Sequence, residues 1–270
     1  MKFNPLLFLA AAAVAAVAAP LPPPAQQLDL DKLPSQSKVI DQVVVPVPSE
    51  VFAALDKLGK PRWAGLIHRE ASKAKPVGEA PQIALMLGSI IAEGFIAVEA
   101  EDTDEVKDIG RAILSFSNAI GVRKAVVRRA NSIIEFADKK SWLKVRGELD
   151  GALNDVREAM VELNSESLAH LVSVGGWLRG TEVVATLVSS DYSRDGAELL
   201  HQPGLLEYFQ RTLGGMKSRL RDHALTVKVR KGLADIRPLT GGDDARVSQK
   251  SAKEIAAIAG DLVKAISSKP

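Results

Sequence analysis

Residues 81–100, PQIALMLGSIIAEGFIAVEA, form the most apolar predicted helix of this 270-residue chain. The uncharged part of the stretch runs only from Ala80 to Ala92. A membrane span needs about 20 consecutive apolar residues, so this part is too short to cross a bilayer. The stretch therefore predicts a helix that packs against other helices.

Small residues mark one side of this predicted helix. Ala84, Gly88 and Ala92 recur every four residues and so share one helix face. Another helix can approach this face closely, because no large side chain lies on it. Ser89 and Glu93 follow a second line, which predicts that Glu93 lies at a narrow hydrated edge.

Apolar residues keep helical spacing from Ser49 onward, and alternating strand patterns of useful length are absent after residue 48. Asp102, followed by Glu105 three residues later, is typical of a capping box at a helix start. Beyond a first helix after Ser49, the expected helices are 61–75, 81–100, 103–120, 122–137, 142–163, 165–189, 194–200, 204–213, 216–236 and 248–266. The sequence thus predicts an all-α fold, a multi-helix bundle or irregular helical array of about nine or ten helices. Residues 49–270 would form this single helical domain.

The N-terminus has the pattern of a bacterial export signal. Lys2 precedes an apolar run from Leu6 to Ala19, and small residues permit cleavage after Ala18. Residues 1–18 are therefore interpreted as a signal peptide, which places the mature protein in the periplasm or outside the cell. Residues 19–48 hold seven of the 14 prolines and predict an extended leader, in which 43–47 could form a short edge strand.

Composition excludes several classes of protein. Hydrophobic residues make up 46% of the chain and charged residues 25%, which excludes a largely disordered protein. The net charge of +2 argues against a dedicated nucleic-acid binder. The chain has no cysteine, so disulfide scaffolds, zinc fingers and cysteine nucleophiles are excluded. Phosphate-binding loops and zinc-protease motifs are absent as well, and no cofactor is predicted.

The most unusual segment is residues 173–180, SVGGWLRG, inside a predicted helix. Each glycine in a helix interior costs about 0.5–1 kcal/mol relative to alanine, so something must offset three of them. Close packing against the Ala84/Gly88/Ala92 stripe is one explanation. A second explanation is a bare groove that binds a ligand, with Gly176 and Gly180 as its floor, Trp177 stacking and Arg179 pairing with an anion. A third is a kink of the helix at Gly175–Gly176.

Glu162, Glu166 and His170 follow one another every four residues. On an unbroken helix they would share a face and could offer two carboxylates and an imidazole to a metal ion. Residues 164–165 could break that helix, and a solvated charged stripe is the alternative interpretation.

Two stretches are basic. The first comprises Arg123, Lys124, Arg128 and Arg129, and the second comprises Lys217, Arg219, Arg221, Lys228, Arg230 and Lys231. Either stretch could meet an anionic membrane or another polyanion. Apolar residues interleave with the second set, so a solvated face of an amphipathic core helix is the other interpretation.

Three functions are compatible with these observations. The first is an exported, non-enzymatic domain that acts through contacts with another protein or an envelope component, and that has no transmembrane segment in its mature form. The second is a helical carrier of a small ligand or metal that uses the glycine-lined groove near Trp177. The third is a hydrolase or transferase without a recognisable motif, whose titratable groups converge only in the fold.

Overall fold

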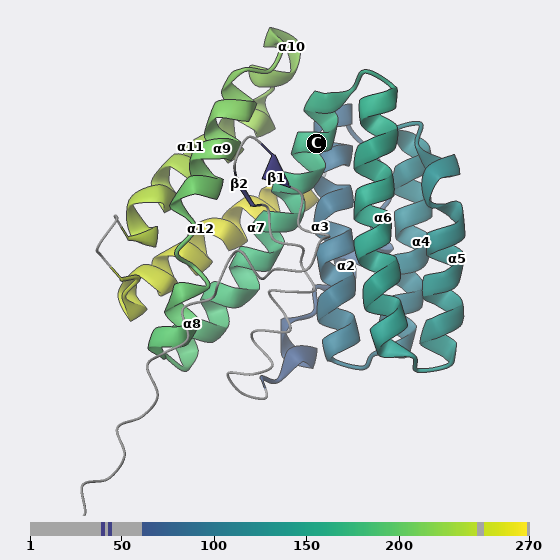
Figure 1. Ribbon diagram of the computed structural model, residues 1–270, viewed down its shortest axis with the longest axis horizontal. Coiled ribbons are helices and arrows are strands. Elements are labelled where there is room, and N and C mark those ends of the chain that lie inside the picture. The colour runs from purple at the N-terminus through teal and green to yellow at the C-terminus, as the bar shows by residue number, and fades with distance from the viewer. Residues whose placement is uncertain (1–38, 41–42, 45–60, 242–245, 269–270) are drawn as a thin grey trace, which may run out of the picture. The chain divides into compact units, whose positions relative to one another are not determined.

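The chain folds into α-helices, as the sequence predicts (Figure 1). The computed structural model describes residues 39–40, 43–44, 61–241 and 246–268. The helices are α2 (Arg69–Lys73), α3 (Ala80–Glu99), α4 (Thr103–Ala119), α5 (Arg123–Asp138), α6 (Trp142–Glu162), α7 (Glu166–Ser190), α8 (Arg194–Glu198), α9 (Pro203–Gly214), α10 (Ser218–Arg221), α11 (Ala224–Ile236) and α12 (Gln249–Ser267), with 3-10 turns η2 (Trp63–Leu66) and η3 (Arg237–Thr240). The expected all-α, multi-helix array is thereby confirmed.

Helix α3 is enclosed by its neighbours. Every residue from Ile83 to Val98 is buried. Helices α4, α6 and α7 pack against α3, and α7 makes the most extensive contact. A helix that is covered on all sides must be apolar all round, which accounts for the composition of this stretch.

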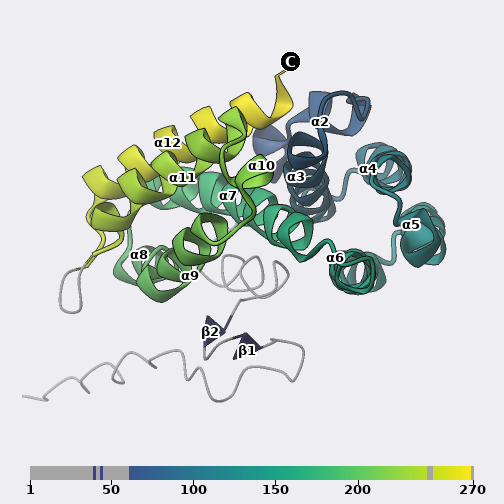
Figure 2. The same cartoon turned by 90° about the horizontal axis from the view of Figure 1, so that it is seen from above.

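Two groups of helices meet at α7. Helices α3, α4, α5 and α6 pack in sequence order and are seen nearly end-on in Figure 2. On its other side α7 packs against α12 and α9, and α11 packs against α12. Helix α7 therefore carries residues that face both groups, which explains why its apolar residues are not confined to one stripe.

Two strands, β1 (Val39–Ile40) and β2 (Val43–Val44), pair antiparallel with Val39 opposite Val44. The second strand coincides with the start of the short strand predicted at 43–47. The predicted signal peptide at 1–18, the remainder of the leader at 19–48 and the helix expected after Ser49 lie outside the described residues.

The prediction of one continuous helix over 61–75 is wrong. The structure has η2 and α2 instead, separated by extended backbone at Ile67. The Leu66 carbonyl accepts a hydrogen bond from Arg179, and the His68 N–H donates to Glu93 over 2.7 Å. These buried side chains replace the helical hydrogen bonds of this segment, so its backbone is satisfied without a continuous helix.

The prediction of a single helix over 216–236 is also wrong. The segment forms two helices, α10 and α11, with a break at 222–223. His223 leaves the helical conformation and caps α11, because its Nδ1 accepts a hydrogen bond from the Leu225 N–H. This cap satisfies one of the backbone N–H groups in the first turn of α11 that have no partner within the helix.

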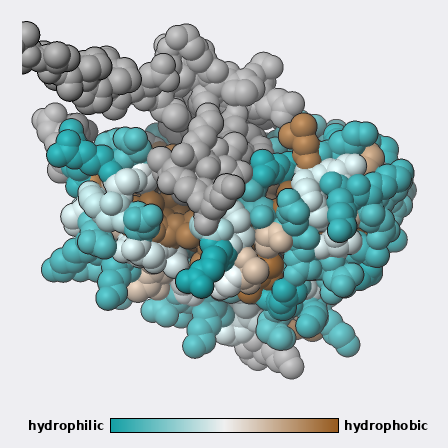
Figure 3. Space-filling view, turned by 90° about the horizontal axis from the view of Figure 1, so that it is seen from below, coloured by the Kyte–Doolittle hydropathy of each residue, from teal (hydrophilic) through white to brown (hydrophobic). Residues whose placement is uncertain are grey.

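Helices α3 and α7 are long and apolar enough to cross a membrane, by length and composition alone. In this fold, however, 94% of the apolar window of α3 and 61% of that of α7 are buried inside the protein. The surface in Figure 3 is mainly hydrophilic, with hydrophobic side chains in separate small areas. The absence of a transmembrane segment stays a prediction.

Candidate functional site

The glycine-rich segment 173–180 lies within α7, where it makes the closest contact with α3. A Cβ added to Gly88 would lie 1.9 Å from the Val172 carbonyl oxygen and 2.8 Å from the Gly176 nitrogen. A Cβ on Gly175 would lie 1.9 Å from the Leu85 carbonyl oxygen. The two helices thus touch backbone to backbone, and this contact offsets the helical cost of Gly88, Gly175 and Gly176.

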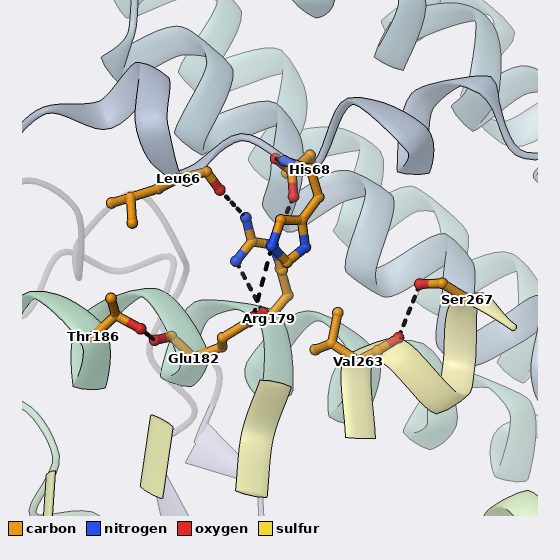
Figure 4. Close-up of polar contacts among 8 residues, drawn as sticks. Leu66, His68, Arg179, Glu182, Thr186, Val263 and Ser267 are labelled. Atoms are coloured by element: carbon orange, nitrogen blue, oxygen red, sulfur yellow. Dashed lines mark hydrogen bonds and ion pairs between the residues drawn. The ribbon is translucent and has the colours of Figure 1, made fainter. Parts of the chain in front are cut away.

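A buried ion pair lies beside this contact. Arg179 on α7 and Glu93 on α3 are 1% and 0% exposed, and the Arg179 Nε donates to Glu93 Oε2 over 2.6 Å. Arg179 Nη1 also donates to Glu182 over 3.0 Å, while Nη2 donates to the Leu66 carbonyl. Figure 4 shows Arg179 between Leu66 and Glu182, with His68 alongside.

The prediction of a hydrated edge at Glu93 is therefore wrong. The carboxylate is sealed inside the fold and is bound by the Arg179 guanidinium and the His68 N–H. Burial of a charge is tolerated only when partners of this kind replace its water. The three donating nitrogens of Arg179 already have acceptors in the protein, which leaves this side chain little capacity to pair with an anionic ligand.

Glu182 and His68 extend the network toward solvent, with 3.7 Å between His68 Nε2 and Glu182 Oε1. The His68 side chain is 45% exposed and that of Glu182 is 16% exposed. Neither residue was predicted from the sequence to belong to a site. The spacing of Arg179 and Glu182, three apart on one helix, was a local signal for their pairing.

Trp177 points away from the ion pair. Its Nε1 donates to the Gln202 side chain over 2.9 Å, and its ring meets Phe209 edge-on at a centroid distance of 5.6 Å. A Cβ added to Gly180 would meet no atom of the described residues within 4 Å, so this glycine takes no part in the close contact between α3 and α7. The structure thus brings Gly176 and Arg179 against α3, while Trp177 packs toward α9.

The conditions for the predicted metal site are not met. Helix α6 ends at Glu162 and α7 begins at Glu166, and Asn164 between them has a φ of 54°. The three residues therefore do not share an unbroken helix. His170 contacts Tyr208, with 3.4 Å between Nδ1 and the phenolic oxygen. Within the described ranges, no group of three His, Asp or Glu could hold a metal ion.

A surface hollow of about 780 Å³ lies between η2 and the C-terminal ends of α3 and α7. Its lining includes Trp63, Glu99 and Thr186, and excludes Trp177, Arg179 and His170. The residues expected to line a carrier site therefore do not meet in this hollow.

A second charged group fixes α2 to the start of α4. Arg69 pairs with Asp102 over 2.7 Å and with Glu105 over 3.3 Å. Burial raises the pKa of Glu105. This effect is larger than either of the two that lower the pKa, the hydrogen bond with Ser72 and the positive charge of Arg69. Burial alone would raise the pKa of Asp102 too, but hydrogen bonds from the Glu105 N–H and from Arg69 hold it below the usual value. The Asp102 cap is confirmed by the bond from the Glu105 N–H at 3.0 Å, whereas the Glu105 side chain turns to Arg69.

The basic segment, residues 217–231, covers α10 and the first two turns of α11. It contains Lys217, Arg219, Arg221, Lys228, Arg230 and Lys231, against the single acid Asp222. Lys217, Arg219, Lys228 and Lys231 are exposed, and Asp222 is paired with Arg221 over 2.8 Å. In the first basic stretch, Arg129 pairs with Glu148 and Asp155, and Arg123, Lys124 and Arg128 are exposed as well.

Comparisons of the chain with models of protein families, with curated proteins and with solved structures give no match.

Proposed function

We propose that this protein is an exported, non-enzymatic helical domain that binds an anionic partner in the cell envelope through the basic segment 217–231. The observation that carries the proposal is the excess positive charge of this segment. Six cations face one acid within fifteen residues, in a chain whose net charge is only +2. Such a concentration of one sign attracts an anionic surface from a distance and orients the encounter.

The interior charges support a structural role for the rest of the fold. Arg179 pairs with both Glu93 and Glu182, and the half-exposed Arg69 pairs with Asp102 and with the buried Glu105. Groups that already satisfy each other stabilise the helix packing and have little capacity left for a substrate. In the basic segment, Lys217, Arg219, Lys228 and Lys231 are instead exposed to solvent, where an anionic surface can reach them.

The export signal predicted at residues 1–18 would bring the domain to envelope surfaces. With the signal removed, the proline-rich leader would precede the helical domain as an extended tether. Binding is therefore proposed to occur from the aqueous side, with no transmembrane segment in the mature chain.

Binding of the mature chain to fluorescent poly-L-glutamate and to phosphatidylglycerol vesicles tests the proposal. The variant K217Q/K228Q/K231Q removes three exposed cations of the basic segment, and R123Q/K124Q/R128Q is the matched control on α5. We expect wild type and control to bind at least one probe, more weakly as salt screens the charges. The first variant should bind about a hundredfold more weakly than wild type, since it lacks three cations. Equal loss in both variants, or no binding by the wild type, would refute the proposal.

A further inference from the structure

We infer that the anionic partner is the surface of a phospholipid bilayer, into which the exposed apolar side chains of the basic segment insert. The inference rests on the proposed function and names its partner. It depends on where apolar side chains lie among the cations, which net charge alone does not reveal.

Helix α11 has two distinct faces in its first two turns. Thr226 and Val229 point into the protein and are fully buried. Ala224, Val227, Lys228 and Lys231 are exposed, at the spacing of one helix face. Val227 is 47% exposed and is one of six large hydrophobic side chains that are exposed in the described part of the chain. The outward face of α11 therefore combines an apolar centre with two lysines.

Helix α10 extends this surface. It packs against α11, and in Figure 1 it lies at the outer end of the α9 and α11 pair. Lys217 and Arg219 are exposed there, and the neighbouring Leu220 is half-buried. Long basic side chains can hold their charged ends at lipid headgroups while their stems and neighbouring apolar groups enter the acyl boundary.

The same residues fit other polyanions less well. Stacking on nucleic-acid bases needs aromatic side chains, and the sequence has no Phe, Trp or Tyr after Phe209. A purely acidic polypeptide would use the cations but would gain nothing from an exposed valine. An anionic bilayer uses both, because it offers negative headgroups above a hydrocarbon layer.

Vesicle co-sedimentation of the full mature chain separates these cases. The vesicles are phosphatidylcholine with or without phosphatidylglycerol, and poly-L-glutamate serves as a polyanion without hydrocarbon. The informative variant is Val227→Ser. Its matched control is Val161→Ser on α6, where the valine is 49% exposed.

We expect wild type to bind only the vesicles that contain phosphatidylglycerol. V227S should weaken that binding about three- to tenfold, since it removes apolar contact with the acyl layer. V161S should bind like wild type. K217Q/K228Q/K231Q should weaken binding about a hundredfold, at about fivefold for each cation. All three variants change exposed residues, so far-UV circular dichroism and thermal unfolding should match wild type.

Equal vesicle binding by V227S and V161S would overturn the inference, because the attraction would then be electrostatic only. Binding to poly-L-glutamate without binding to vesicles would also overturn it, and would leave the proposed function standing. Failure to bind either probe would remove both.

Discussion

The Arg179→Met substitution tests the buried ion pair that joins α3 to α7. It removes the guanidinium but keeps a long apolar side chain in a site that is 1% exposed. Among the described residues, Glu93, which is 0% exposed, would retain only the His68 N–H at 2.7 Å as a hydrogen-bond donor. The Leu66 carbonyl would lose the Arg179 hydrogen bond as well.

The expected cost is large because the remaining carboxylate has no access to water. Breaking a buried pair by removing one partner costs about 3–5 kcal/mol, since an uncompensated charge is left in the interior. The double variant E93Q/R179M removes that charge too. We expect it to recover more than half of the lost free energy of unfolding, because neutral groups of similar shape avoid the desolvation penalty.

Urea denaturation followed by circular dichroism at neutral pH gives these free energies. Arg129→Met is the control, because Arg129 is 26% exposed and its pairs with Glu148 and Asp155 should contribute only about 1 kcal/mol or less. An R179M variant as stable as R129M, or a double variant no more stable than R179M, would show that the pair does not hold the helices as described.

Four further substitutions are informative. Gly88→Ala should destabilise the fold by about 1–3 kcal/mol or more in urea denaturation, because its Cβ would lie 1.9 Å from the Val172 carbonyl oxygen. The Cβ of Gly180→Ala would meet no atom of the described residues within 4 Å, so this substitution should raise the free energy of unfolding by about 0.5–1 kcal/mol. Equal effects at the two glycines would contradict the close contact between α3 and α7. Glu105 has a raised pKa, so its folded form holds the proton more tightly, and wild type should gain stability relative to E105Q as the pH falls from about 7 toward 4. Asp102 has a lowered pKa, so the stability advantage of wild type over D102N should be lost as the pH falls. If the stability difference between wild type and E105Q changed with pH in the same direction as that between wild type and D102N, the two opposite pKa shifts would be contradicted.

The long helices could be predicted from sequence because each carries its own apolar period and start signal. Helix α4 begins after Asp102 as expected, and α12 begins after Ser248, whose side chain accepts from the Ser251 N–H. The tight contact between α3 and α7 was also foreseeable, since glycines on two helices suggest close approach. The start of a helix depends on residues within that helix, and the close contact depends on glycines that both helices carry.

The buried network could not be predicted because its parts are far apart in sequence. Arg179 and Glu93 are 86 positions apart, and Arg179 and Leu66 are 113 apart. No local pattern says which carboxylate an arginine will meet across a helix interface. The break in 61–75 has the same origin, since its backbone is held by side chains of α3 and α7.

The basic segment is an intermediate case. Its charges were evident in the sequence, but their exposure depended on which face of α11 packs inward. The expected single helix is divided at 222–223, and Val227 on the outward face of α11 lies in solvent beside Lys228. That placement is what suggests a lipid partner rather than an ordinary solvated helix.

The most direct test of the functional account is the equilibrium partition of K217Q/K228Q/K231Q and R123Q/K124Q/R128Q between buffer and phosphatidylglycerol vesicles. Both variants lose three positive charges, so net charge cannot separate them. Only K217Q/K228Q/K231Q should release the protein from the vesicles. Indistinguishable partition of the two variants would contradict binding through the basic segment.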